Sequence, residues 1–383
     1  MQVPLLDINR QHAGIEEELK QVFAKALSSS RFIKGPDMEA LEAEFAEYSG
    51  TKEAIGCASG TDALILALQA TGLKRDELVI TVPFTFFATA GAIVRAGGTP
   101  VFIDILPDTF NMDPDLLSEW LNNNCAITNR GVIHRKSGRR VAAIIPVHIF
   151  GQIANMDAIN GVASTWELPV VEDAAQAVGA KWRDSRAGSL GTVGCFSFFP
   201  SKNLGALGDG GMLTTDNPEL AKRLRSIREH GGQGYLHAEV GTNSRLDAIQ
   251  AGFLRVKLRR LEEWHKGRRA NAERYKEAFT GVDQVRTPVI DPRAWSIYNQ
   301  YTLLAESRDE LLGFLRSRQI GCAVYYPLPL HLQECFRDLG YSQGDFKVSE
   351  DCSGKVISLP VFGELTKEEQ DEVIAAVKEF YQR

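Results

Sequence analysis

The sequence is poor in the residues that build metal centres and disulfide frameworks. It contains six cysteines and seven histidines among 383 residues. The cysteines are scattered, with no CxxC pair, and no pair of histidines has the spacing of a zinc site. We therefore expect no bound metal and no disulfide framework, and free thiols in the reducing cytoplasm.

Positive charge and long apolar runs are also lacking. The 43 Lys and Arg residues are outnumbered by 49 Asp and Glu residues, which gives a formal net charge of −6. Binding of nucleic acid through its phosphates needs the opposite balance. No apolar run is long enough to span a bilayer, and the first ten residues do not resemble a signal peptide. We expect a cytoplasmic globular protein that binds neither nucleic acid nor membrane.

What the sequence does contain is an alternation of short apolar segments with helical patterns. Strands are predicted at 54–57, 79–81, 100–103, 141–147 and 168–172, and helices at 14–30, 37–48, 61–71 and 86–96. Asp37 is a possible N-cap of the second helix. Strands that alternate with helices build βαβ units. The pattern thus predicts an α/β fold whose large domain has a mostly parallel sheet flanked by helices.

The pattern changes after about residue 217. Helices are predicted at 218–230, 244–279, 308–318 and 366–381, with a strand at 300–305. We interpret this part as a smaller C-terminal α+β domain joined through the long helix. The predicted division is 1–252 for the large domain, including an N-terminal substrate segment, and 253–383 for the small one.

A basic segment at 131–140 interrupts the alternation. It is typical of a hairpin that turns at Ser137-Gly138. Its arginines and lysine could form a solvated face, or a basic arm near an anionic ligand or a partner subunit.

Three short segments carry residues suited to catalysis. Ser59-Gly60-Thr61 lies between a predicted strand and a helix, where free backbone N–H groups and hydroxyls can bind a phosphate. The turn could equally be an ordinary helix cap.

Asp173 follows an apolar strand, at the sheet edge where α/β folds place ligands. It could pair with a protonated ring nitrogen or cap a helix.

Lys202 is a single lysine in a run of apolar and small residues, with Ser197 before it and several glycines after it. Desolvation lowers the pKa of such a lysine, and a neutral amine can form a Schiff base with a carbonyl. A strand-terminal acid followed by a serine and then a lysine is the order that a pyridoxal phosphate site requires. A lysine at the mouth of a loop, with its ammonium in water, is the alternative.

Two further segments are suited to binding an anion or a sugar. Asn243 and Arg245 lie in a polar loop that opens a helix, and Tyr325 and His331 flank a proline-rich extended segment. A capped helix with a surface arginine, and an ordinary surface or core histidine, are the alternatives.

Together these motifs resemble the DegT/StrS family, the pyridoxal-phosphate nucleotide-sugar aminotransferases of fold type I. The resemblance rests on Ser59–Leu64, Pro83–Thr89, Pro146–Gly151, Glu172–Gln176, Phe196–Lys202 and Gly241–Arg245. It extends from near Leu5 to near Phe362, and the joint order and spacing of the motifs are highly specific.

The resemblance implies roles around the cofactor ring. Lys202 would carry pyridoxal 5′-phosphate as a Schiff base, and Asp173 would pair with the pyridine nitrogen. Gln176 would lie by the ring and its phenolic oxygen, and Phe86 would stack on the ring face.

The resemblance also implies roles around the phosphate and the substrate. The phosphate would be held by Ser59, Gly60, Thr61 and Ser197. Asn243 would reach the phosphate of the neighbouring subunit's cofactor, so the active unit would be a homodimer. The sugar nucleotide would lie near Arg245, Tyr325, His331 and the 32–36 loop, which contains Phe32, Lys34 and Gly35.

The residues before the lysine subdivide the family. Members that aminate sugar C4 often have Ser-Phe-His there, whereas this chain has Ser197-Phe198-Phe199-Pro200 and resembles the C3 branch. Segments 233–237 and 296–301 also resemble enzymes of UDP-linked 3-keto-2-acetamido sugars.

The implied reaction moves the amino group of L-glutamate to a UDP-2-acetamido-3-keto hexose or hexuronate, for lipopolysaccharide, lipid A or a related glycan. Pyridoxamine 5′-phosphate and 2-oxoglutarate form on the way, and Lys202 moves the proton. A dTDP-3-keto-6-deoxyhexose substrate and amination at C4 stay open.

Three other functions are compatible with parts of the pattern. A sugar dehydratase of the same fold would lack the lysine at 202. A non-catalytic regulator would keep the fold to sense its ligand. A cofactor-free Schiff-base aldolase would use Lys202 and leave Asp173, Ser197 and Asn243 without a role.

Overall fold

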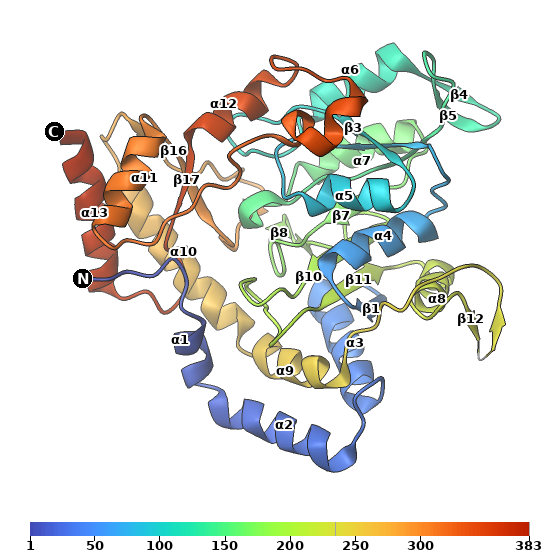
Figure 1. Ribbon diagram of the computed structural model, residues 1–383, viewed down its shortest axis with the longest axis horizontal. Coiled ribbons are helices and arrows are strands. Elements are labelled where there is room, and N and C mark those ends of the chain that lie inside the picture. The colour runs from blue at the N-terminus through green and yellow to red at the C-terminus, as the bar shows by residue number, and fades with distance from the viewer. Residues whose placement is uncertain (234, 383) are drawn as a thin grey trace.

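The computed structural model describes residues 1–233 and 235–382 (Figure 1). Its centre is a four-stranded and a three-stranded sheet, joined edge to edge by parallel bridges between Ile144 and Val170 and between Val147 and Asp173. The joined order is β3 (Thr99–Phe102), β2 (Leu78–Thr81), β6 (Val141–Ile144), β7 (Val171–Asp173), β10 (Val193–Ser197), β11 (Gly211–Thr215) and β1 (Glu53–Cys57). Among these strands β11 alone runs antiparallel to its neighbours. The predicted mostly parallel sheet is confirmed.

Helices cover both faces of this sheet because successive strand residues point to opposite sides. On β1, Ile55 and Cys57 join one apolar cluster, and Ala54 joins the other. The first cluster includes α4 (Gly60–Ala70), α5 (Ala88–Arg95) and α8 (Pro218–Ile227). The second includes α3 (Pro36–Ser49), α6 (Pro114–Asn124), α7 (Met156–Thr165) and α9 (Ala248–Leu258). The flanking helices expected from the sequence are therefore present.

The C-terminal sheet and the helices α11 (Arg308–Ser317) and α13 (Lys367–Gln382) have their own apolar cluster and lie at one end of the molecule, on the left in Figure 1. The antiparallel sheet comprises β14 (Val285–Arg286), β16 (Tyr301–Ala305) and β17 (Val356–Leu359). Helices α11 and α13 pack on it, and Val3 from the N-terminus joins the same cluster. The segment between α11 and β17, with Leu330, Phe336 and Phe346, packs instead on Ala90 and Phe102 of the large domain. The division at 252 falls within α9 and stays a prediction.

The remaining elements connect these parts. They are α1 (Ile8–Ala13), α2 (Glu16–Ser29), β4 (Cys125–Thr128), β5 (Gly131–His134), β8 (Lys181–Trp182), β9 (Ser185–Arg186), β12 (Gly232–Gln233), β13 (Leu236–His237), α10 (Leu261–Ala278), β15 (Ala294–Trp295) and α12 (Lys347–Lys355), with short 3₁₀ turns at Ile149–Gly151, Leu330–Leu332 and Glu334–Leu339. Within the residues that the structure describes, no helix combines the length and the apolar character needed to cross a bilayer.

The basic segment forms the predicted hairpin. Strand β5 pairs antiparallel with the residues that precede β6, through a bridge between Ile133 and Arg140 and a bond from His134 N–H to the Arg139 carbonyl (2.9 Å), and the turn between them contains Ser137 and Gly138. On its other edge β5 pairs with β4, a strand that was not predicted.

Two arginines of the hairpin contact neighbouring elements. Arg135 donates to the carbonyls of Asn122 and Asn123 at the end of α6 (3.0 and 2.9 Å). Arg140 forms an ion pair with Glu77 (2.6 Å). Arg135 and Arg140 thus connect the hairpin to the large domain, although Arg135 and Lys136 are exposed. The solvated face and the basic arm both stay predictions.

The predicted cap of α3 is wrong. Gly35, with φ of 98°, occupies the N-cap position, and Asp37 lies in the first turn. There the Asp37 carboxylate accepts from Lys25 and Arg255 (2.8 Å each). The two cations lower the pKa of Asp37 against the opposing effect of burial. Asp37 therefore connects α3 to α2 and α9.

Candidate functional site

A cavity of about 550 Å³ opens at the carboxyl ends of the sheet strands. Many of the residues predicted for catalysis, cofactor binding and substrate binding line it, and we call them the inner group. They are Ser59, Gly60, Thr61, Phe86, Asp173, Gln176, Ser197, Lys202 and Tyr325. These residues come from segments that are distant in the sequence, and the fold brings them to one place.

The first wall of the cavity is the start of α4. Ser59 is the N-cap, and its Oγ accepts from the backbone N–H of Asp62 (3.1 Å). The N–H groups of Gly60 and Thr61, at the first helical positions, have no intrahelical acceptor. A Cβ at Gly60 would lie 2.6 Å from Cβ of Ser197, so glycine is required for β10 to approach the helix start. This wall presents a helix N-terminus and hydroxyl groups to an anion.

The two acids at the end of β7 have different surroundings. Glu172 is fully buried and its carboxylate accepts from His148 and from the backbone N–H groups of Gly188, Leu190 and Gly191 (2.6 to 2.9 Å). Nδ1 of His148 accepts from Ala154, so its Nε2 donates to Glu172. Glu172 thus has a full set of structural donors.

Asp173, in contrast, lines the cavity. Its carboxylate accepts from Thr89 Oγ1 (2.7 Å) and from the backbone N–H of Ala175 (3.2 Å). Burial raises the pKa of Asp173, and these bonds and the charge of Lys202 oppose the rise. The carboxyl group is therefore held rigidly and partly desolvated, as a group that receives a cationic ring nitrogen would be.

Lys202 stands at the tip of a tight turn after β10. Its backbone N–H donates to the carbonyl of Phe199 (2.8 Å), and Phe199 itself is exposed and lines the cavity. Burial lowers the pKa of Lys202 to about 8, against the opposing charge of Asp173. More of this amine is uncharged near neutral pH than of an ordinary lysine, and a nucleophile or proton carrier needs the uncharged form.

Aromatic side chains and Gln176 complete the cavity. Gln176 Oε1 accepts from the backbone N–H of Phe150 (2.7 Å), and its Nε2 donates to the hydroxyl of Tyr326 (2.9 Å). The Phe86 ring is exposed on the cavity side, with its centroid 6.2 Å from that of Tyr326. The amide of Gln176 is thereby fixed beside the space in which a planar ring would lie.

Five predicted residues lie elsewhere, on two loops, and we call them the outer group: Phe32, Lys34, Gly35, Asn243 and Arg245. Phe32, Lys34 and Asn243 are exposed, whereas Gly35 and Arg245 are half-buried. Their two loops meet, because the backbone N–H of Ala248 donates to the carbonyl of Phe32 (2.9 Å). Lys34 forms an ion pair with Glu229, whose backbone pairs with Asn243. None of the outer group lines the cavity of the inner group.

His331 is separated from both groups. It is buried, its Nε2 lies 3.0 Å from Glu350 Oε1, and its ring packs against Phe346. Burial lowers the pKa of His331 against the effect of Glu350. Its role in substrate binding stays a prediction, and the described contacts give it a structural partner. The 233–237 motif includes Gly234, which lies outside the described residues.

The sequence interpretation missed four contributors to the site. Thr89 orients Asp173, and Tyr326 orients Gln176. Ser244 Oγ accepts from Ala58 N–H (3.2 Å) and donates to Asp62 (2.9 Å), which ties the 241–247 loop to the start of α4. His148 orients Glu172. All four lie within motifs that the sequence presents, and Ser244 and Tyr326 are adjacent to residues that were predicted.

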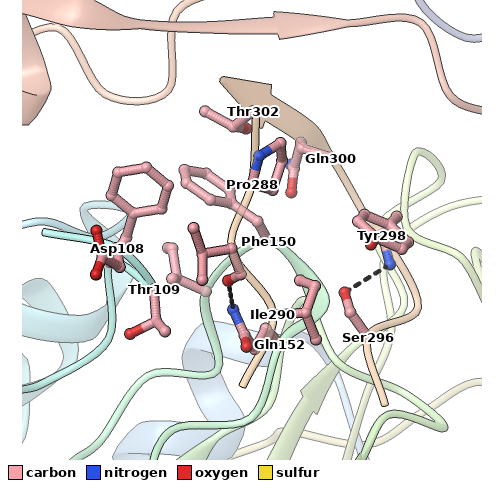
Figure 2. Close-up of a pocket in the computed structure, with 13 residues that line it drawn as sticks. Asp108, Thr109, Phe150, Gln152, Pro288, Ile290, Ser296, Tyr298, Gln300 and Thr302 are labelled. Atoms are coloured by element: carbon pink, nitrogen blue, oxygen red, sulfur yellow. Dashed lines mark hydrogen bonds between the residues drawn. The ribbon is translucent and has the colours of Figure 1, made fainter. Parts of the chain in front are cut away.

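A second, smaller cavity lies between the 108–110 and 149–152 segments and the strand that begins at Tyr301 (Figure 2). Its volume of about 20 Å³ holds a water molecule at most. Gln300 lines both this space and the large cavity. Among the described residues, no three His, Cys, Asp or Glu side chains gather to hold a metal ion.

Comparisons with known proteins agree with this geometry. The chain matches the model of the DegT/DnrJ/EryC1/StrS aminotransferase family over residues 13–378. It is 45% identical to the pleiotropic regulatory protein of Geobacillus stearothermophilus, over 100% of this chain and 99% of that protein. It is 41% identical to the UDP-N-acetyl-3-dehydro-alpha-D-glucosamine 3-aminotransferase of Acidithiobacillus ferrooxidans, over 98% of this chain and 96% of that protein.

A solved structure gives the same result for the fold. The chain superposes on S. venezuelae DesV, solved in complex with a ketimine intermediate, with a TM-score of 0.93 and 38% identity, covering 100% of this chain and 99% of DesV. The relatives thus include nucleotide-sugar aminotransferases and one protein named for regulation.

Proposed function

The chain belongs to the DegT/DnrJ/EryC1/StrS aminotransferase family, and from this premise we propose that it transfers the amino group of L-glutamate to a nucleotide-linked 3-keto sugar. The observation that carries the proposal is the meeting of Lys202 and Asp173 in one cavity, where burial lowers the pKa of the lysine to about 8. An amine and a carboxyl group with these properties are what amino-group transfer requires.

Pyridoxal phosphate is the cofactor of this family and of this chain, and the inner group fits it. The buried Asp173 carboxyl suits the pyridine nitrogen, and the start of α4 with Ser197 suits the phosphate. Lys202 suits the aldehyde. When bound, the cofactor supplies an electron-withdrawing ring that stabilises negative charge next to the amino nitrogen.

The residues of the chain supply binding and proton transfer. We assign to the Lys202 amine the removal of the proton from the glutamate α-carbon and its return in the second half of the reaction. Asp173 holds a positive charge on the ring nitrogen, and Thr89 holds Asp173. Phe86 and Tyr326 limit the access of water to the reacting atoms.

We further propose that the sugar is aminated at C3 and carried by UDP, as a 2-acetamido-3-keto hexose or hexuronate. Support comes from Phe199, which lines the cavity where C4-type sequences often have histidine. It also comes from the relative that is named as a UDP-sugar 3-aminotransferase. A dTDP-3-keto-6-deoxyhexose is the second candidate substrate, supported by the relative from Streptomyces venezuelae named as a dTDP-3-amino-3,4,6-trideoxy-alpha-D-glucose transaminase.

The outer group supports a proposed homodimer, in which Asn243 reaches the neighbouring subunit's cofactor site. Its members are ligand-type residues on two joined surface loops that do not line the cavity of their own chain. We propose a cytoplasmic location and a role in lipopolysaccharide or related glycan synthesis, since nucleotide sugars are the precursors of such glycans.

The test combines a colour change with a substrate panel. The purified protein should be yellow with cofactor and bleach when L-glutamate is added. It should then convert a UDP-2-acetamido-3-keto sugar, in preference to dTDP-3-keto and 4-keto sugars, to an amine detected by mass spectrometry and NMR. Bleaching without conversion of any sugar in the panel would overturn the proposed substrate class.

A non-catalytic regulator is the other candidate function. It is favoured by the 45% identity to a protein named for pleiotropic regulation. A yellow protein that does not respond to glutamate would support this function and contradict the aminotransferase.

A further inference from the structure

Lys257, in α9, is a buried cation that the proposed reaction does not use. Its side chain is 0% exposed, and its Nζ donates to the carbonyl of Gly205 (2.7 Å). In the part of the chain that the structure describes, no carboxylate pairs with it. Burying an ammonium group without an anion is unfavourable, so packing alone would be better served by an apolar residue.

The carbonyl that Lys257 contacts belongs to the turn that carries Lys202. The backbone N–H of Ala206 donates to the carbonyl of Phe198 (2.8 Å), which closes this turn. At Gly205 a Cβ would lie 2.3 Å from the carbonyl oxygen of Pro200, so the two ends of the turn are in close contact. Lys257 therefore holds the turn at Gly205, and neither residue lines the cavity.

The groups around Lys257 leave this bond as its main polar contact. From α1, His12 faces it, and burial together with the charge of Lys257 lowers the pKa of His12. Burial lowers the pKa of Lys257 itself to about 8. A second hydrogen bond holds the same turn: Asn203 Nδ2 donates to the carbonyl of Ile297 (3.2 Å). The turn is thus fixed to α9 and to the segment before β16.

We propose that Lys257 is a positioning residue for Lys202, because its bond to Gly205 holds the turn that directs the Lys202 amine into the cavity towards Asp173. The proposal rests on the proposed function only in the role given to Lys202. It concerns the reactivity of that amine, which can be measured without cofactor or sugar.

The test uses Lys257→Met, which replaces the apolar stem with an unbranched side chain of similar volume and removes the donor. Cofactor-free protein is pulse-labelled with an amine reagent over a pH series, and the Lys202 peptide is quantified by mass spectrometry. In the variant, the pH of half-maximal labelling should rise by about one unit, because a loosened turn admits water to the amine. With cofactor, kcat of the glutamate half-reaction should fall about tenfold with little change in KM.

Arg308→Met is the matched control, since Arg308 is also a buried cation that donates to carbonyls, those of Ser353 and Val356 (3.2 and 3.0 Å), without contacting the turn. It should leave the labelling of Lys202 unchanged. Lys257→Arg keeps a donor and should restore the wild-type midpoint. Lys257→Gln, which cannot reach Gly205, is expected to behave like Lys257→Met and replaces it if that variant does not fold.

A wild-type midpoint and kcat in both Lys257→Met and Lys257→Gln would overturn the proposal, as would an equal shift in Arg308→Met. These outcomes are independent of the proposed function. A protein that transaminates no substrate can still show the labelling shift, and an active aminotransferase can lack it.

Discussion

The inner and outer groups contain similar kinds of residue but are built in different ways. The inner group lies in a cavity whose polar atoms are oriented by bonds within the chain, such as Thr89 to Asp173 and Tyr326 to Gln176. The outer group lies on two loops at the surface, and Phe32 is 46% exposed. The difference indicates that one chain suffices to organise the inner group, whereas in the proposed homodimer the outer residues would act on the neighbouring subunit.

The largest expected effect tests the inner group. Lys202→Ala should lower turnover by about 10⁴-fold, because it removes the base and acid of proton transfer. Steady-state rates with glutamate and the keto sugar measure this effect. The protein should stay folded by circular dichroism, and normal turnover would contradict the assignment.

Asp173→Asn should lower turnover by about 10²- to 10³-fold, because the charge facing the ring nitrogen is lost while the shape is kept. The same change should lower the pKa of Lys202 below about 8, since the Asp173 charge now raises it. Labelling of Lys202 over a pH series measures the second effect. A midpoint that rises instead would show that the two groups do not interact.

Burial near the inner group also predicts a pH-dependent stability difference. The pKa of Lys257 is lowered from 10.5 to about 8 in the folded state, so the folded protein binds fewer protons than the unfolded one between these values. The free energy of unfolding should therefore rise with pH in this interval. Lys257→Met should be more stable by about 2 kcal/mol below pH 8, after allowance for the lost hydrogen bond, and the gain should vanish near pH 10.5.

Denaturant unfolding at several pH values checks this prediction. Lys34→Met, in the outer group, is the control, because the exposed Lys34 ion pair contributes little. If Lys257→Met and Lys34→Met changed the pH dependence of the free energy of unfolding equally, burial near the inner group would not explain the effect.

The outer group should respond to protein concentration. Asn243→Ala should weaken retention of the cofactor about tenfold, through loss of one hydrogen bond to the neighbouring subunit's phosphate. Absorbance after gel filtration at several protein concentrations measures retention. If the wild-type protein is monomeric and retains cofactor fully, Asn243 does not act across an interface.

The smallest expected effect concerns the choice of sugar. Phe199→His should shift the ratio of kcat/KM for 4-keto over 3-keto sugars by a few-fold, because the residue lies on the cavity wall without contacting Asp173. Competition between the two sugars in one reaction measures the ratio. An unchanged ratio would remove Phe199 as evidence for C3 chemistry.

Much of the architecture could be predicted because apolar residues recur at the regular spacings of helices and strands. The alternation on β1 and the apolar runs of β6 and β7 identify a buried sheet, and the motif order identifies the site. Strand β4 was not predicted because it is short and only its first residue, Cys125, is buried, whereas Ile127 is exposed. Asp37 looks like a cap by composition, but the backbone of Gly35 takes that position.

The different surroundings of Glu172 and Asp173 could not be predicted from the local sequence pattern. Both acids follow the same strand, and local pattern does not tell which one faces the cavity. Only the folded chain shows that the loop at 188–191 supplies N–H groups to Glu172. Ser244 is similar, since its partners Ala58 and Asp62 are distant in the sequence.

The Ser244 bonds have a consequence for communication between subunits. Ser244 joins the start of α4, the proposed phosphate site, to the loop that carries the adjacent Asn243. In the proposed homodimer, this loop would touch the neighbour's cofactor while being anchored beside its own. Filling one site would then alter the affinity of the other, and the two halves would load their cofactors cooperatively rather than independently.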